Sequence, residues 1–288
     1  MRSSGSATKK EASARLRFFK NPVSVAALIV FAVILFCCVF APVVSRYGYA
    51  EMRVSERFLK PCSDHIFGCD YAGRDTFARV LYGGRNTLKI AAVATVLAAL
   101  GGMTLGIISG ICGGTTDMLI MRAMEILSAV PSLLLVILAE CLMGWGKGNF
   151  MYAMALSALP SVVRLIRASV SQVMSKSYIE ASRALGVKGL RLVFKHILPN
   201  ILPSVFVHLT GTFAEQILLC SIMGYVGVGI NPPQAEWGLI IFGGYASLTT
   251  APHAVLLPAA VIAVCVLSVN LIGNGLRDAV DGGDRSDG

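Results

Sequence analysis

Charge is scarce in this sequence of 288 residues, because only 14% of them are charged while 55% are hydrophobic. A soluble domain carries about 25% charged residues, so we expect a domain buried in a lipid bilayer. The net charge of +9 would also suit a nucleic-acid binder. The Lys and Arg residues gather beside apolar segments, however, which is the pattern of cations that orient spanning helices. We therefore expect a bilayer, and no nucleic acid, as a partner.

The sequence also lacks a metal-binding spacing of Cys and His, and it lacks the GxxxxGK[ST] loop that cradles ATP phosphates. No Ser/His/Asp set indicates an enzyme. Six of the eight cysteines lie in or beside apolar segments. Cys62 and Cys69 lie instead in a polar loop, where a disulfide and two unrelated thiols are both consistent with the sequence.

Long uncharged runs are what the sequence does contain. They predict an all-α membrane protein with about six transmembrane helices. We expect a basic amino tail at 1–22, a first transmembrane helix at 23–44, an extracytoplasmic loop at 45–86, a core at 87–276 and a tail at 277–288. Within the core, the apolar segments lie at about 88–111, 119–145, 149–170, 201–225 and 254–276.

The distribution of cations predicts the orientation of these spans. The stretch 164–200 is rich in Lys and Arg, whereas 226–253 contains neither, so both termini and a loop at 171–200 are predicted to be cytoplasmic. The loop at 45–86 carries seven cations and disagrees with this rule. In the second span, glycines at four-residue spacing predict a close helix contact: Gly102, Gly106, Gly110 and Gly114.

The stretch from Ser177 to Asn200 is amphipathic and basic. Ser177 and Glu180 have the spacing of a capping box, which predicts a short helix that Gly186 ends in the left-handed conformation. A second short helix, closed by Pro199, is predicted by apolar residues at helical spacing: Leu190, Val193, Phe194 and Ile197. Such a stretch is consistent with a linker that lies on anionic lipid headgroups and with a docking surface for a protein. Glu180 is likewise consistent with a helix cap and with a contact to a partner protein.

The same stretch resembles the EAA loop of the membrane subunits of ATP-driven importers. The positions that match its pattern are Glu180, Ala181, Ser182, Gly186, Leu198 and Pro199, with Ser182 in place of the second Ala. His196 stands where the general pattern has Ile, and KHILPN is similar to the RHILPN of the branch that handles peptides and nickel. The segments HIFGCDYAGRDTFARVLYGGRNTL, PPQAEW and NLIGNGLRD also resemble motifs of that branch.

The chain thus resembles the second, or C-type, permease of dipeptide, oligopeptide and nickel importers. This resemblance implies a type I ABC importer permease fold. It implies a bacterial or archaeal cytoplasmic membrane, a second homologous permease, two ATPase subunits and an extracytoplasmic substrate-binding protein. ATP and Mg would bind the ATPase subunits, and no cofactor would bind this chain. The first EAA helix, with Leu185 as an apolar anchor, would sit in a groove of an ATPase subunit.

Peptide is the cargo that the resemblance favours, and nickel or a metal chelate is the alternative. A secondary transporter or a membrane enzyme is the alternative from another class, and neither explains the EAA loop. Glu140 and Glu215 are carboxylates inside predicted spans, where a charge is costly. They are candidates for the transport pathway or its gate, or else acids that join helices.

Overall fold

The computed structural model describes residues 17–144, 146–187 and 189–281. Apart from an isolated β-bridge between Cys69 and Asp75, the regular structure in these residues is helical. In chain order the elements are α2 (Pro22–Val39), α3 (Ala41–Val44), η1 (Val54–Glu56), α4 (Thr76–Cys112), α5 (Gly114–Ala129), α6 (Ser132–Met143), α7 (Lys147–Met174), α8 (Ser177–Ala184), α9 (Gly189–Leu192), the π-helical segment η2 (Val193–Ile197), α10 (Leu198–Val226), α11 (Trp237–Tyr245) and α12 (His253–Asp281).

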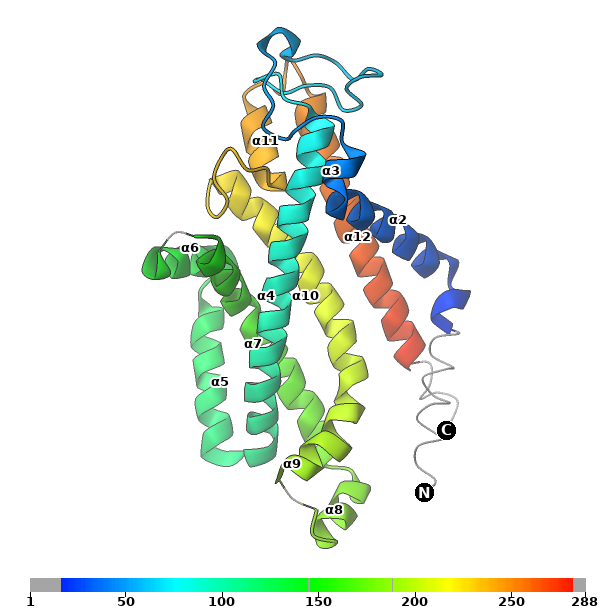
Figure 1. Cartoon of the computed structure of the whole chain (residues 1–288). Helices are drawn as coiled ribbons and strands as arrows, with labels where there is room; N and C mark the ends of the chain where they lie inside the picture. The colour runs from blue at the N-terminus through cyan, green and yellow to red at the C-terminus, as the bar shows by residue number, and fades with distance from the viewer. Residues whose placement is uncertain (1–16, 145, 188, 282–288) are drawn as a thin grey trace.

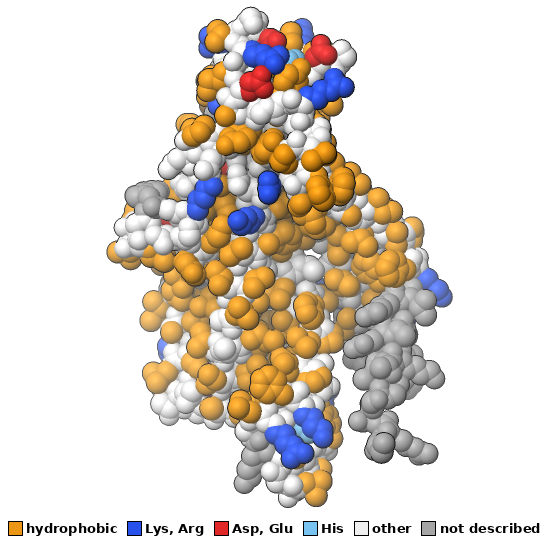
Figure 2. All heavy atoms as spheres, in the orientation of Figure 1, with side chains coloured by type: hydrophobic (Ala, Val, Ile, Leu, Met, Phe, Trp, Pro, Cys, Tyr) orange, Lys and Arg blue, Asp and Glu red, His pale blue; other side chains and the backbone are white. Residues whose placement is uncertain are grey.

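Five helical runs in the described residues are long and apolar enough to cross a bilayer: α2, α4, α7, the run from α9 to α10, and α12. Counting α5 and α6 as one broken span gives up to six, which confirms the predicted number. Residues 45–75, here called the outer cap, lie at one end of the bundle, and α8 lies at the other (Figure 1). Hydrophobic side chains cover much of the surface between these two ends, and charged side chains are most numerous at the ends, with a few Lys or Arg side chains between them (Figure 2).

The predicted glycine contact joins α4 to α7. A Cβ on Gly106 would lie 2.8 Å from Ile166 Cβ, and one on Gly110 would lie 2.7 Å from Val170 Cγ1. The absence of a side chain on α4 therefore lets the two helices approach closely. Gly114 does not belong to this contact, because it begins α5 with a positive φ and nothing lies within 4 Å of its Cβ position.

The predicted span at 119–145 is not a straight helix, because α5 and α6 meet at an angle of 98°. Pro131 explains the break. A proline disfavours the helical conformation in the residue before it, and Val130 is accordingly extended (φ −91°, ψ 126°). In the first predicted span, α2 ends at Val39 and the short helix α3 follows as far as Val44.

The segment between α10 and α12 is fixed to the first half of α4 by buried polar groups. The Trp237 indole Nε1 donates to the Val80 carbonyl oxygen at 2.9 Å. Glu236 accepts from the Thr87 hydroxyl at 2.9 Å and, as the N-cap of α11, from the Leu239 amide at 2.9 Å. These bonds hold the segment that follows α10 against the outer end of α4.

Candidate functional site

The beginning of α8 differs from the prediction. Its N-cap is Lys176, which makes no side-chain capping bond, and Ser177 is already the first helical residue. The predicted capping box of Ser177 and Glu180 is therefore wrong. Ile179 is fully buried and packs with the apolar residues of α7 and α10, so it holds the short helix to the bundle.

The end of α8 is as predicted. Gly186 has a φ of +84°, which is the left-handed conformation that favours glycine after a helix. The Gly186 amide donates to the Arg183 carbonyl at 2.9 Å, and the Val187 amide donates to the Ser182 carbonyl at 3.1 Å. These two bonds are those of a Schellman motif, so α8 ends at a defined residue and in a defined direction.

The outward face of α8 carries the residues that match the EAA pattern. Glu180 and Ala181 are exposed, and Ser182 is half-buried and donates to the Tyr178 carbonyl at 2.8 Å. Leu185, directly after the helix, has 85% of its surface exposed. A leucine so exposed, next to a rigid helix end, is typical of an anchor that a partner covers.

The second predicted helix of this loop does not close at Pro199. Instead α9, η2 and α10 continue as one helical run, and Pro199 is the second residue of α10. In η2 the Leu198 amide bonds the Val193 carbonyl, one residue further back than in an α-helix. His196 is half-buried in this segment, and Pro199 is exposed.

The apolar side chains of this run divide between two environments. Leu192 and Ile197 are buried, whereas Leu190 and Phe194 are 75% and 64% exposed. The two exposed side chains, with Leu198, line an apolar groove against the end of α4.

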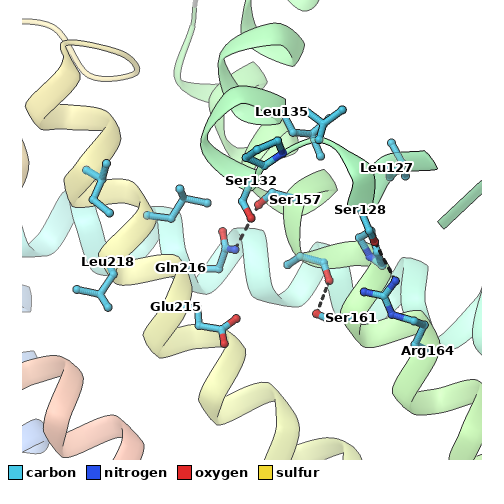
Figure 3. Close-up of a pocket in the computed structure, with 16 residues that line it drawn as sticks. Leu127, Ser128, Ser132, Leu135, Ser157, Ser161, Arg164, Glu215, Gln216 and Leu218 are labelled. Atoms are coloured by element: carbon cyan, nitrogen blue, oxygen red, sulfur yellow. Dashed lines mark hydrogen bonds between the residues drawn. The ribbon is translucent and has the colours of Figure 1, made fainter. Parts of the chain in front are cut away.

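A pocket of about 460 Å³ lies where the α5–α6 break meets α7 and α10. Figure 3 shows that Glu215 and Gln216 of α10 face Ser157 and Ser161 of α7 across it. The Gln216 amide donates to Ser157 Oγ at 3.5 Å. Arg164 donates to Ser128 Oγ at 2.9 Å on the same wall. The pocket is thus a polar site within an apolar bundle, with one cation and one carboxylate at its edge.

The structure separates the two candidate carboxylates. Glu215 is exposed and lines the pocket. Glu140, in α6, is fully buried, and its Oε1 accepts from the Gly146 amide at 3.2 Å. Glu140 does not line the pocket. Its contact with the α6–α7 turn fits the alternative of an acid that joins helices, whereas Glu215 is the candidate that lines the pocket.

The sequence analysis did not predict Arg164 or Gln216 as pocket residues. A signal was present, because Ser157, Ser161 and Arg164 recur at spacings of four and three and so share one face of α7. A polar stripe on an otherwise apolar span favours a wall of a cavity over lipid contact.

Cys62 and Cys69 are both free thiols in the structure, which corresponds to the second of the two possibilities that the sequence left open. Cys62 is exposed in a turn that its amide closes on the His65 carbonyl. Cys69 is fully buried and bonded through its amide to the Leu59 carbonyl. Burial, together with the negative charge of Asp75 and Glu56, raises the pKa of the Cys69 thiol to about 12.

These observations define a class of protein. A helical membrane bundle with a polar pocket inside it, and with a rigid, apolar-tipped helix at one end, is typical of a transport permease that a separate subunit drives. The chain belongs to the family of binding-protein-dependent transport system inner membrane components, whose model matches residues 102–283. Residues 12–61 match the N-terminal TM domain of oligopeptide transport permease C.

The relatives cover nearly the whole chain. The oligopeptide transport system permease protein OppC of Bacillus subtilis is 38% identical over 93% of this chain and 88% of its own. The dipeptide transport system permease protein DppC of Alkalihalophilus pseudofirmus is 37% identical over 91% and 86%. The MetNI methionine ABC transporter, in inward-facing conformations, has a chain that aligns with a TM-score of 0.59 at 19% identity, over 69% of this chain and 95% of its own. The similarity to the MetNI chain shows that the two chains share a fold.

Membership in this family assigns the chain to the bacterial inner membrane as a multi-pass permease subunit. The ATPase of such a transporter is a separate subunit, and a binding protein and a further permease belong to the same system. The chain is therefore not itself an enzyme.

Proposed function

We propose that this chain is the C-type permease of an ATP-driven importer of di- or oligopeptides. The names of its relatives and the match to an oligopeptide permease domain support peptide as the cargo. In this proposal a second homologous permease completes the pathway, two ATPase subunits bind on the cytoplasmic side, and an extracytoplasmic binding protein delivers the peptide. Both termini and the loop at 171–200 face the cytoplasm.

The observation that carries the proposal is the exposure of Leu185 at the end of α8. Burying a leucine side chain stabilises a contact by about 1.5–3 kcal/mol, and none of the described residues buries this one. The Schellman motif fixes the direction in which Leu185 points, and Ile179 fixes α8 to the bundle. A partner that holds Leu185 in a groove would therefore move the spans and not merely bend a loop.

The pocket of Figure 3 is the part of the pathway that this chain contributes in the proposal. A peptide carries an ammonium group at one end and a carboxylate at the other, and Glu215 and Arg164 offer charges of the opposite sign to each. Serine hydroxyls and the Gln216 amide bond peptide groups of any sequence. Such a lining suits a cargo class that varies in its side chains.

The test is reconstitution of the chain with its partner subunits in liposomes, followed by uptake of labelled peptides and ATP hydrolysis stimulated by the loaded binding protein. Leu185→Asp is expected to abolish both, because a carboxylate cannot enter an apolar groove without a large desolvation cost. Leu185→Met is the matched control and should retain both. Normal stimulation in Leu185→Asp would refute the docking role. Uptake of nickel without uptake of any peptide would refute the proposal that peptides are the cargo.

A further inference from the structure

Three side chains of the outer cap converge on one point: Glu56, His65 and Cys69. One ligand atom of each lies within 4.8 Å of the other two. The His65 side chain is 4% exposed and that of Glu56 is 29% exposed, while Cys69 is fully buried. The cluster lies far from α8, at the opposite end of the bundle (Figure 1), and the proposed transport function uses none of its members.

The orientation of the His65 ring favours metal binding. Its Nδ1 lies 2.7 Å from Asp75 Oδ2, and a carboxylate can only accept, so Nδ1 carries the proton. Nε2 is the ring nitrogen that lies near Glu56, at 3.3 Å from Oε2. A carboxylate on the far nitrogen is the usual support of a histidine that binds zinc. Tyr47 stacks on the ring at 4.7 Å between centroids and holds its plane.

The contact between His65 and Glu56 is not explained by a hydrogen bond. Glu56 Oε2 lies 3.3 Å from Nε2, yet this oxygen is buried and has no hydrogen-bond partner among the described residues. A cation that both Nε2 and Oε2 bind would give this buried oxygen the partner that it lacks among the described residues.

The spacing fits a small tetrahedral cation. With zinc bonds of about 2.0–2.2 Å to nitrogen and oxygen, two such ligands of a tetrahedral site lie about 3.3–3.4 Å apart, which is the separation of Nε2 and Oε2 without any movement. A sulfur ligand lies further out, at about 2.3 Å from the metal. The charges also fit, because a thiolate and a carboxylate together balance a divalent cation.

We propose that Glu56, His65 and Cys69 bind one Zn²⁺ ion, with Asp75 as the positioning residue of His65 and a water molecule as the fourth ligand. Sulfur, imidazole and carboxylate together favour zinc over magnesium or calcium, which prefer oxygen alone. The thiol proton of Cys69 leaves to solvent when the metal binds. Glu56 keeps its second oxygen for Arg53, which lies 3.5 Å away.

The ion would tie together three parts of the outer cap. Glu56 ends η1, His65 and Cys69 belong to the turn that follows, and Asp75 is the N-cap of α4, where its Oδ1 accepts from the Ala78 amide at 2.6 Å. Metal binding would thus fix a cap with little core of its own onto the beginning of a spanning helix.

The experiment measures metal in the full chain, purified with its partner subunits in detergent under reducing conditions, stripped with a chelator and reloaded with Zn²⁺ alone. We expect about one zinc ion per chain and a higher thermal midpoint than in the stripped protein. Reloading with Co²⁺ should give thiolate-to-cobalt charge-transfer absorption, which reports the sulfur ligand directly.

Cys69→Thr should lose the cobalt–sulfur absorption, and Glu56→Gln, which leaves every thiol in place, should lose most of the bound zinc. Cys62→Ser is the matched control from the same loop and should keep both signals. The proposal is overturned by a wild-type chain that binds no zinc, by a Cys69→Thr variant with unchanged cobalt absorption, or by loss of the metal in Cys62→Ser. A Cys62–Cys69 disulfide found by mass spectrometry in the protein from cells would overturn it as well.

Discussion

Replacement of Gly186 by valine tests whether the defined end of α8 is needed for coupling. At its φ of +84°, a residue with a Cβ pays roughly 1–2 kcal/mol, and a β-branched side chain is a poorer fit still. Nothing lies within 4 Å of the Cβ position, so the cost comes from the backbone alone and not from a clash. If residue 186 leaves the left-handed conformation to relieve this strain, the two hydrogen bonds of the Schellman motif break, at a cost of about 0.5–1.5 kcal/mol each.

Since 1.4 kcal/mol corresponds to a factor of ten, the fraction of chains with a correctly ended α8 should fall about tenfold or more in Gly186→Val. The assay is ATP hydrolysis of the reconstituted complex, stimulated by substrate and binding protein. Asparagine tolerates the left-handed region, so Gly186→Asn is the control and should retain most of the stimulation. Assembly of the subunits is expected to persist in both variants. Stimulation at the wild-type level in Gly186→Val would refute the reasoning.

Three further outcomes are expected. In intact cells without native thiols, an impermeant maleimide should label Asn231→Cys and not Arg191→Cys, and the reverse pattern would invert the proposed topology. Gly106→Val should lower stability by about 1–3 kcal/mol through overpacking against α7, measured as a lower thermal midpoint, and an unchanged midpoint would contradict the close contact. In metal-free protein at pH 8–9, Cys62 should be alkylated while Cys69, whose pKa burial raises to about 12, stays protonated; equal rates would contradict its burial.

Prediction from the sequence was most accurate where a residue type fits only one conformation or one kind of contact. Gly186 had to end a helix, and the glycines of α4 had to meet another helix. The sequence is less informative where an apolar residue has more than one possible environment. Leu190 and Phe194 have the spacing of an apolar helix face, and they are exposed. Hydrophobicity alone does not decide whether such a residue contacts the core, the lipid or a partner.

The outer cap shows a second limit of sequence analysis. Glu56, His65 and Cys69 do not form a spacing motif, because their convergence depends on the β-bridge between Cys69 and Asp75 and on turns that bring η1 back to this bridge. Pro131 was visible as a proline in a span, but a proline in a sequence does not give the angle between the helices on either side of it, which is 98° here.

The π-helical segment η2 sets the rotational register between the two ends of the run from α9 to α10. A π turn holds one residue more than an α turn, and each α-helical residue turns the chain by about 100°. Deleting one residue from Val193–Ile197 would restore regular α-helix and rotate α9 by roughly that angle relative to α10. The exposed side of α9, with Leu190, would then face a new direction. The length of this short segment, more than its composition, therefore determines the direction in which the exposed side chains of α9 point.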